Sequence, residues 1–205
     1  MARAFLTEPE GLVALLDDGE RRVLSGLLRQ TRVLLSPEVE STGDAFDDLM
    51  ASMGVSLSEQ LGETGDPDDA RVSEAGRRDP ALDRLLPSAH RGDDAVAAEF
   101  RRLTEEGLRQ RKSANLDIAV ARVEAALDDR VVLDTAAAPA FLIALTDVRL
   151  LLGERMGMRT EEDAEALHAA METIEDDDPL GYAMAWYDFL TWLQETLTHA
   201  LMGDA

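Results

Sequence analysis

Apolar and polar positions repeat with a helical period along most of this chain. Apolar residues recur at steps of three and four, which is the spacing of one face of an α-helix. The helices predicted from this pattern cover residues 17–36, 80–86, 94–127, 133–157, 160–175 and 179–202. We therefore predict a mostly α protein with a C-terminal helical bundle of about four helices.

The N-terminal residues follow a different pattern. Residues 3–6 and 12–16 are short runs rich in apolar side chains, and Gly11 between them favours a turn. The sequence thus predicts a small N-terminal β-hairpin before the first helix. We expect residues 1–36 to belong to the same single domain as the helical bundle, which we place at residues 80–205.

Residues 37–79 separate these two parts and differ from them in composition. Gly, Asp, Ser, Glu and Pro dominate the segment, and its few apolar positions do not repeat. Such an acidic, polar composition is typical of solvated chain. We interpret the segment as an acidic, partly mobile insertion, and the alternative is a recognition tail that binds a partner.

Capping residues mark the ends of several predicted helices. The candidate N-caps are Asp17 or Asp18, Asp134 or Thr135, Thr160 together with Asp163, and Asp178. Pro179 suits the first position of the last helix, and Gly203 follows its last turn.

The net charge of −22 is large for a chain of 205 residues, and it opposes binding to nucleic acid or to anionic membranes. Residues 91–127 carry as many basic as acidic side chains, whereas residues 128–205 carry four basic and 17 acidic ones.

The absence of cysteine excludes disulfides and thiolate chemistry. Because no apolar run approaches the ~20 residues of a membrane span, we expect a cytoplasmic protein without a membrane segment.

The segment 182–192 holds both tryptophans and both tyrosines of the chain. Helical spacing places Tyr182, Trp186 and Phe189 on the core-facing side of the last helix. Trp192 lies off that side, so it either lines a pocket or covers the seam between helices with its N–H bound to a carboxylate.

A charged residue interrupts the apolar face of the helix at 133–157. Arg155 lies on that face, so it needs a carboxylate partner, for which Asp147 and Asp188 are the candidates. The alternative to a structural ion pair is an anion site built from Arg149 and Arg155. We expect a binding site, if there is one, in the groove between these arginines and the flank of the last helix that carries Trp192. The candidate binding residues are therefore Asp147, Arg149, Arg155, Asp188 and Trp192.

Two further patterns offer other chemistries. Glu165 and His168 have the Glu-x-x-His spacing of di-iron bundles, but a second such motif is lacking, and Glu195 with His199 is only an approximation to one. Residues 101–112 form the only basic segment, which resembles a DNA-reading helix but lacks a recognisable turn and partner helix. We expect no metal and no other cofactor, and we interpret the basic segment as a solvated or internally paired face.

Four blocks of the sequence together resemble an actinobacterial family of uncharacterised domains. They are "DPALDRLLPSAHRGD", "EFRRLTEEGLRQRKSANL", "LTDVRLLLGERMG" and "YDFLTWLQETL", in this order along the chain. Genes of this family often lie near those of the Clp-protease adaptor, of a metal-dependent isopeptidase and of a sulfur-carrier route to cysteine. The resemblance therefore implies a role in proteolysis or sulfur-carrier handling, and it supplies no catalytic residues.

The most economical interpretation is a cytoplasmic helical interaction protein, of adaptor type and without catalytic activity. We expect a protein partner or a homo-oligomer. A DNA-binding transcriptional regulator that uses residues 101–112 is the first alternative. The second is a helical protein that binds metal through carboxylates and histidines.

Overall fold

A computed structural model of the chain describes residues 2–36, 79–87, 94–171 and 178–203, with the backbone alone for residues 94–103 and 171. The predicted insertion lies outside the described residues except for Asp79. The same holds for residues 172–177, which include the end of the helix predicted at 160–175.

The predicted mostly α architecture is confirmed. The helices are α1 (Asp18–Leu34), α4 (Pro80–Leu85), α5 (Asp94–Glu124), α6 (Ala137–Arg155), α7 (Glu161–Met171) and α8 (Pro179–Met202). The strands are β1 (Arg3–Glu8), β2 (Gly11–Leu15) and β3 (Arg130–Leu133). No described helix is both long and apolar enough to cross a membrane.

The predicted hairpin is present, and it is extended by a strand that the sequence pattern did not predict. β1 pairs with β2 and β2 pairs with β3, both antiparallel. β3 has only four residues and follows a tight turn, so its pattern is too short to be recognised alone. Gly11 has φ +135°, and a Cβ there would lie 2.4 Å from the carbonyl oxygen of Leu133, so close pairing of the sheet requires glycine.

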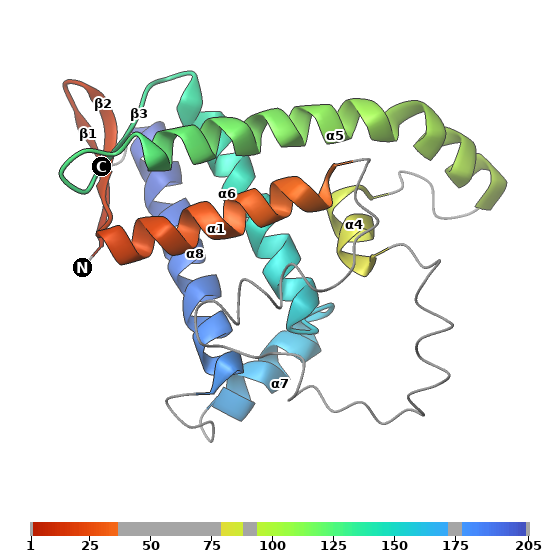
Figure 1. Cartoon of the computed structure of the whole chain (residues 1–205). Helices are drawn as coiled ribbons and strands as arrows, with labels where there is room; N and C mark the ends of the chain where they lie inside the picture. Colours follow the sequence, from red (N-terminus) through yellow and green to blue (C-terminus); the bar gives the residue numbers. More distant parts are fainter. Residues whose placement is uncertain (1, 37–78, 88–93, 172–177, 204–205) are drawn as a thin grey trace.

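The helices form two layers (Figure 1). α1 and α5 run side by side in one layer and cross α6 and α8 in the other, with the sheet at one end of both layers. The short α4 packs against α6, and β1 packs against α8. The largest fully buried side chains belong to one hydrophobic core and include Phe5, Leu24, Leu28, Leu116, Phe141 and Leu145.

The predicted N-caps of α1, α7 and α8 are confirmed. Asp17 and Glu20 form a capping box at α1. At α7 the backbone N–H of Thr160 donates to the carboxylate of Asp163, and the backbone N–H of Asp163 donates to the hydroxyl oxygen of Thr160. Asp178 accepts the N–H of Leu180 at the start of α8, and Gly203 ends that helix in the left-handed conformation. The N-cap of α6 is Ala136 instead of the predicted Asp134 or Thr135. Asp134, two residues before it, accepts hydrogen bonds from the backbone N–H groups of Ala136 and Ala137.

Candidate functional site

The side chains between α6 and α8 converge on Arg149. Its Nη1 donates to Oε1 of Gln194 at 2.9 Å, and its Nη2 donates to the hydroxyl oxygen of Tyr187 at 3.3 Å. The guanidinium carbon lies 5.0 Å from the centroid of the Tyr187 ring, within the range of cation–π attraction. Gln194 in turn donates from Nε2 to Thr146 Oγ1 at 2.8 Å. These contacts hold the guanidinium in one orientation.

Arg149 is half-buried, yet it has no carboxylate partner in the described part of the chain. Its Nε is buried without any hydrogen-bond partner among those residues. Ion pairs engage most other described arginines, namely Arg21, Arg22, Arg29, Arg32, Arg84, Arg109, Arg122, Arg130, Arg155 and Arg159. Within the described ranges, Arg149 is therefore an arginine whose charge no carboxylate balances.

The structure does not bring Arg149 to Trp192. The two residues that Arg149 contacts lie on one side of α8, and Trp192 is five residues after Tyr187, about 140° around the helix. Trp192 stacks on Phe189 with ring centroids 5.8 Å apart. Among the described residues its N–H has no carboxylate partner, and Asp188 is exposed without a hydrogen bond or ion pair. The contacts of Arg149 therefore lie on the flank of α8 opposite to Trp192, and not in the expected groove beside Trp192.

The aromatic side chains of α8 form a ladder of ring contacts rather than part of the fully buried core. Tyr182, Trp186, Phe189 and Trp192 are half-buried, with successive centroids 6.4, 5.0 and 5.8 Å apart. The fully buried positions of α8 are Ala183, Met184, Leu190, Leu193, Leu197 and Ala200. The prediction that the aromatic residues lie on the core-facing side of α8 is correct in general direction. The fully buried positions on this side are occupied by smaller residues, because these fit between closely packed helices.

Arg155 has the carboxylate partner that its position requires, but neither Asp147 nor Asp188 supplies it. Its Nη2 lies 2.5 Å from Oδ2 of Asp79, the N-cap of α4. Sequence reasoning missed this partner because Asp79 is 76 residues away and was assigned to the end of the insertion.

A second ion-pair group fixes the same end of α6. The buried carboxylate of Glu154 bridges Arg84 of α4, at 3.0 Å, and Arg159, at 2.8 Å. Arg84 also donates to the carbonyl oxygen of Met158 at 2.7 Å. Together with the Asp79–Arg155 pair, these contacts hold α4 against α6, so the Arg155 end of the proposed anion site is structural.

Asp147 pairs with Lys112, the single lysine of the chain. The side chain of Asp147 is 1% exposed, and its Oδ2 has no hydrogen-bond partner in the described residues. Burial raises the pKa of Asp147, and the hydrogen bond from Lys112 opposes this shift. Since Asp147 faces α5 and Arg149 lies about 200° around α6 from it, these two candidate residues do not share a site.

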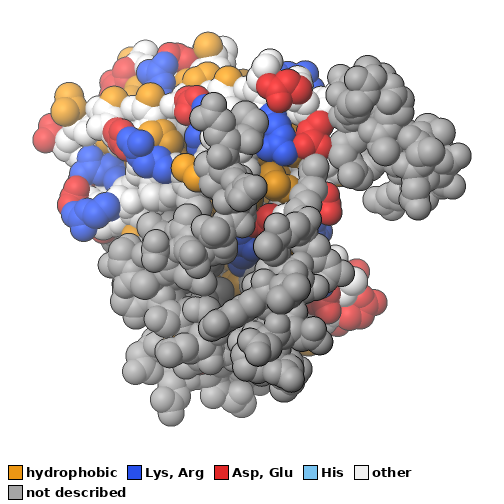
Figure 2. All heavy atoms as spheres, turned by 45° about the vertical axis from the view of Figure 1, so that its right-hand side comes forward, with side chains coloured by type: hydrophobic (Ala, Val, Ile, Leu, Met, Phe, Trp, Pro, Cys, Tyr) orange, Lys and Arg blue, Asp and Glu red, His pale blue; other side chains and the backbone are white. Residues whose placement is uncertain are grey.

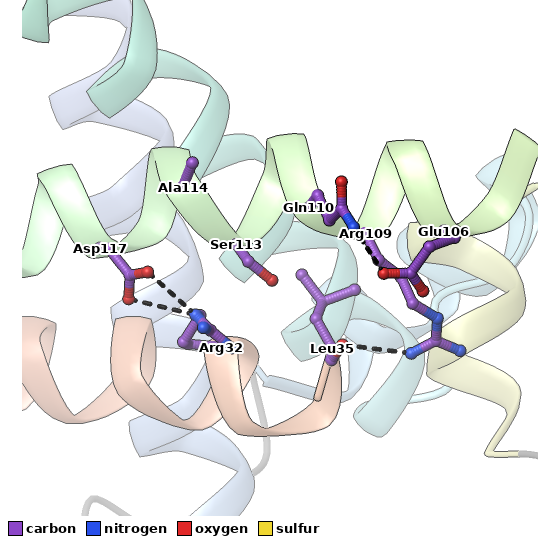
Figure 3. Close-up of a pocket in the computed structure, with 8 residues that line it drawn as sticks. All are labelled: Arg32, Leu35, Glu106, Arg109, Gln110, Ser113, Ala114 and Asp117. Atoms are coloured by element: carbon purple, nitrogen blue, oxygen red, sulfur yellow. Dashed lines mark hydrogen bonds and ion pairs between the residues drawn. The ribbon is translucent and has the colours of Figure 1, made fainter. Parts of the chain in front are cut away.

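A pocket of about 260 Å³ opens between α1 and α5 (Figure 3). Its arginines already have partners: Arg32 pairs with Asp117 at 3.1 Å, and Arg109 pairs with Glu105 and donates to the carbonyl oxygen of Leu35. The remaining lining residues are Glu106, Gln110, Ser113 and Ala114. The pocket has equal numbers of basic and acidic side chains in its lining, and its volume lies below the ~300 Å³ of ordinary ligand cavities. Its contacts therefore serve mainly to join the two helices.

The alternative chemistries find little support in the geometry. In the residues that the structure places, no three His, Asp or Glu side chains lie close enough to hold a metal. His168 bonds to the carbonyl oxygen of Ala164 in its own helix, and Glu165, Glu195 and His199 are exposed. In the basic segment 101–112, Arg109 and Lys112 are committed to ion pairs within the fold.

Charged side chains of both signs are interspersed on the part of the surface that Figure 2 shows in colour. Two arginines of α1 pair with carboxylates of α5: Arg29 with Glu124 at 2.5 Å and Arg32 with Asp117 at 3.1 Å. Carboxylates of the near-neutral segment thus help to dock α5 on α1.

Comparison with known proteins identifies a family. The model of a family described as "Domain of unknown function (DUF2017)" matches residues 2–201, nearly the whole chain. No curated protein and no solved structure matches the sequence.

Proposed function

This chain belongs to the DUF2017 family, a domain of unknown function, and we propose that it is a non-catalytic helical protein that binds a partner protein through the side chains around Arg149. The observation that carries this proposal is the half-buried guanidinium without a carboxylate partner among the described residues. Burying a charge is costly unless it is paired. An open partner position at Arg149 is therefore better explained by binding than by folding alone.

The remaining described geometry supports the same class of function. The other candidate groups have structural roles: Arg155 and Asp147 form ion pairs, and the pocket between α1 and α5 has internally paired arginines. We further propose an adaptor role in proteolysis or sulfur-carrier handling, because the resemblance implies these processes. Their components are the first partners to test.

Affinity capture from a native lysate of the source bacterium tests the proposal. The full chain, its Arg149→Met variant and a matched Arg111→Met variant are used as bait, and captured proteins are quantified by mass spectrometry. Arg111 is exposed and lies on α5, away from the α6–α8 contacts. We expect a partner whose yield falls at least about tenfold with Arg149→Met, the size of one lost charged contact, and is unchanged with Arg111→Met.

Two results would contradict this function. Recovery of no protein beyond the chain itself would remove the partner. Tight DNA binding that weakens steeply with salt and is lost in Arg109→Ala would favour the regulator alternative instead.

A further inference from the structure

The geometry points to a carboxylate side chain of a partner polypeptide as the group that Arg149 binds. This inference rests on the proposed function and specifies its ligand chemistry. A guanidinium has five N–H donors, of which two are used by Gln194 and Tyr187 and the buried Nε has no partner. Two Nη hydrogens therefore remain for an incoming acceptor, and carboxylates are the acceptors that match guanidinium geometry best.

The surroundings of Arg149 are built to hold the guanidinium while leaving its charge available. Gln194 and Tyr187 are neutral acceptors, so they orient the group without neutralising it. Thr191 donates to the carbonyl oxygen of Tyr187 within α8, and Gln194 is fixed through Thr146. Pre-ordered donors lose little conformational entropy on binding, so a single carboxylate contact gains affinity from this arrangement.

An exposed apolar side chain indicates that the carboxylate belongs to a polypeptide. Leu201 is 40% exposed. It lies seven residues after Gln194 on α8, about 20° around the helix and about 10 Å along its axis. An extended segment with an apolar residue three positions from its Asp or Glu spans about 10 Å, so such a segment reaches both Arg149 and Leu201.

Charge selects the kind of segment that binds. Asp188 and Glu195 are exposed on α8, about 80–100° around the helix from Tyr187. They repel a second negative charge, as does the net charge of −22. The ligand is therefore a segment with an isolated acidic residue next to apolar ones, rather than a polyacidic run.

NMR titration of the full-length protein tests the carboxylate site directly. Sodium acetate is compared with sodium chloride at equal ionic strength, and the side-chain N–H signals of Arg149 and Gln194 are followed. We expect saturable shifts with acetate alone, which are retained in Arg111→Met and lost in Arg149→Met. Equal shifts with both salts, or shifts that persist in Arg149→Met, would overturn the inference.

A variant can lose acetate binding simply because it is misfolded. A second variant, expected to bind acetate more tightly, therefore provides a test that misfolding cannot imitate. The double substitution Asp188→Asn/Glu195→Gln removes two repelling charges from the exposed flank of α8. We expect it to tighten acetate binding about twofold or more at low salt, because exposed charges within a Debye length act on each other. An affinity that is unchanged or lower would contradict the proposed position of the carboxylate.

Two peptides then distinguish a polypeptide ligand from a small carboxylate. Ac-Leu-Ser-Ser-Glu-Ser-NH2 is compared with its Gln analogue and with acetate. We expect the Glu peptide to bind at least about tenfold tighter than acetate, as a partly buried leucine contributes, and to lose this gain in Leu201→Ser. A Glu peptide no tighter than acetate, or equal binding of the Gln peptide, would overturn the polypeptide assignment.

The two proposals fail independently. If partner capture is lost with Arg149→Met but neither acetate nor the Glu peptide binds at Arg149, the carboxylate inference fails while the proposed function stands. If acetate and the Glu peptide bind as expected but no partner is captured, the ligand chemistry stands and the proposed function fails.

Discussion

Lys112 and Asp147 show how strongly a single residue choice depends on its surroundings. The chain uses arginine in nearly all of its basic positions, yet the position facing buried Asp147 is its one lysine. The side chains are 15% and 1% exposed. Removing two charges from water costs several kcal/mol each, and their mutual attraction offsets this only when both are present.

Breaking this pair is expected to destabilise the fold, whereas replacing both members is not. Lys112→Met leaves the Asp147 carboxylate buried alone, which lowers the free energy of unfolding by about 3–5 kcal/mol at pH 8. Lys112→Met/Asp147→Leu brings it back to within about 1 kcal/mol of the wild type. Urea unfolding followed by circular dichroism measures both. A double variant as unstable as the single one would show that the pair does more than neutralise charge.

The loss in Lys112→Met should also depend on pH. The pKa of Asp147 is already raised by burial, and Lys112→Met removes the group that opposes the shift. A carboxyl with a raised pKa in the folded state binds a proton more readily folded than unfolded, so stability falls as pH rises through that pKa. The variant should therefore be closer to the wild type at pH 5 than at pH 8, and an equal deficit at both would contradict this.

At the scale of elements, the start of α6 depends on a carboxylate just before it. Hydrogen bonds from the backbone N–H of Ala137 chiefly lower the pKa of Asp134, and Ala136 and Arg122 add to the effect. Because the pKa is lowered on folding, this stabilisation is present above the unfolded value of about 3.9 and is lost as pH falls through the folded pKa. α6 carries Arg149, so the cap also supports the candidate site.

Asp134→Asn separates capping from charge. Asparagine keeps the acceptor oxygen but does not titrate, so the variant should lose less stability than the wild type between pH 5 and pH 3. Asp134→Ala should be less stable than both at neutral pH because the cap is gone. Thermal unfolding across this pH range is the measurement, and parallel pH profiles for all three proteins would refute the role of the carboxylate.

The turn between α5 and β3 is a second element-scale feature. Asp128 and Asp129 have φ of +51° and +64°, a region that Asp tolerates better than β-branched residues do. Asp128→Val should therefore lower the free energy of unfolding by about 1–2 kcal/mol relative to Asp128→Gly. Denaturant unfolding of the two variants checks this, and equal stabilities would indicate that the turn changes its conformation.

At the scale of the whole molecule, the charge of −22 opposes compactness. Internal ion pairs between α1 and α5 and around Glu154 offset part of this repulsion locally. The repulsion caused by the remaining excess of negative charge is long-ranged. Salt screens this repulsion, since the Debye length falls from about 30 Å at 0.01 M to about 10 Å at 0.1 M.

The melting temperature should consequently rise between about 0.01 M and 0.3 M NaCl, because screening weakens the net repulsion more than it weakens the partly buried pairs. Calorimetry at both salt concentrations measures the effect. Sucrose at matched osmolality serves as an uncharged control, and a falling melting temperature would mean that the ion pairs dominate instead.

The sequence by itself determined the helices, the N-caps of α1, α7 and α8, and the β1–β2 hairpin. These features depend on residues close together along the chain: Asp17 bonds to Glu20, and Asp178 to Leu180. Helical periodicity and capping chemistry act over a few residues, so they can be read directly from the order of amino acids.

Only the tertiary structure decided which candidate residues meet. Arg149 and Arg155 were identified as important charges, but their partners lie 38 to 76 residues away, at Tyr187, Gln194 and Asp79. The short β3 likewise needs β2 beside it. Which side chains meet across that distance depends on how the helices cross and pack, and helical spacing fixes only the face on which each side chain lies.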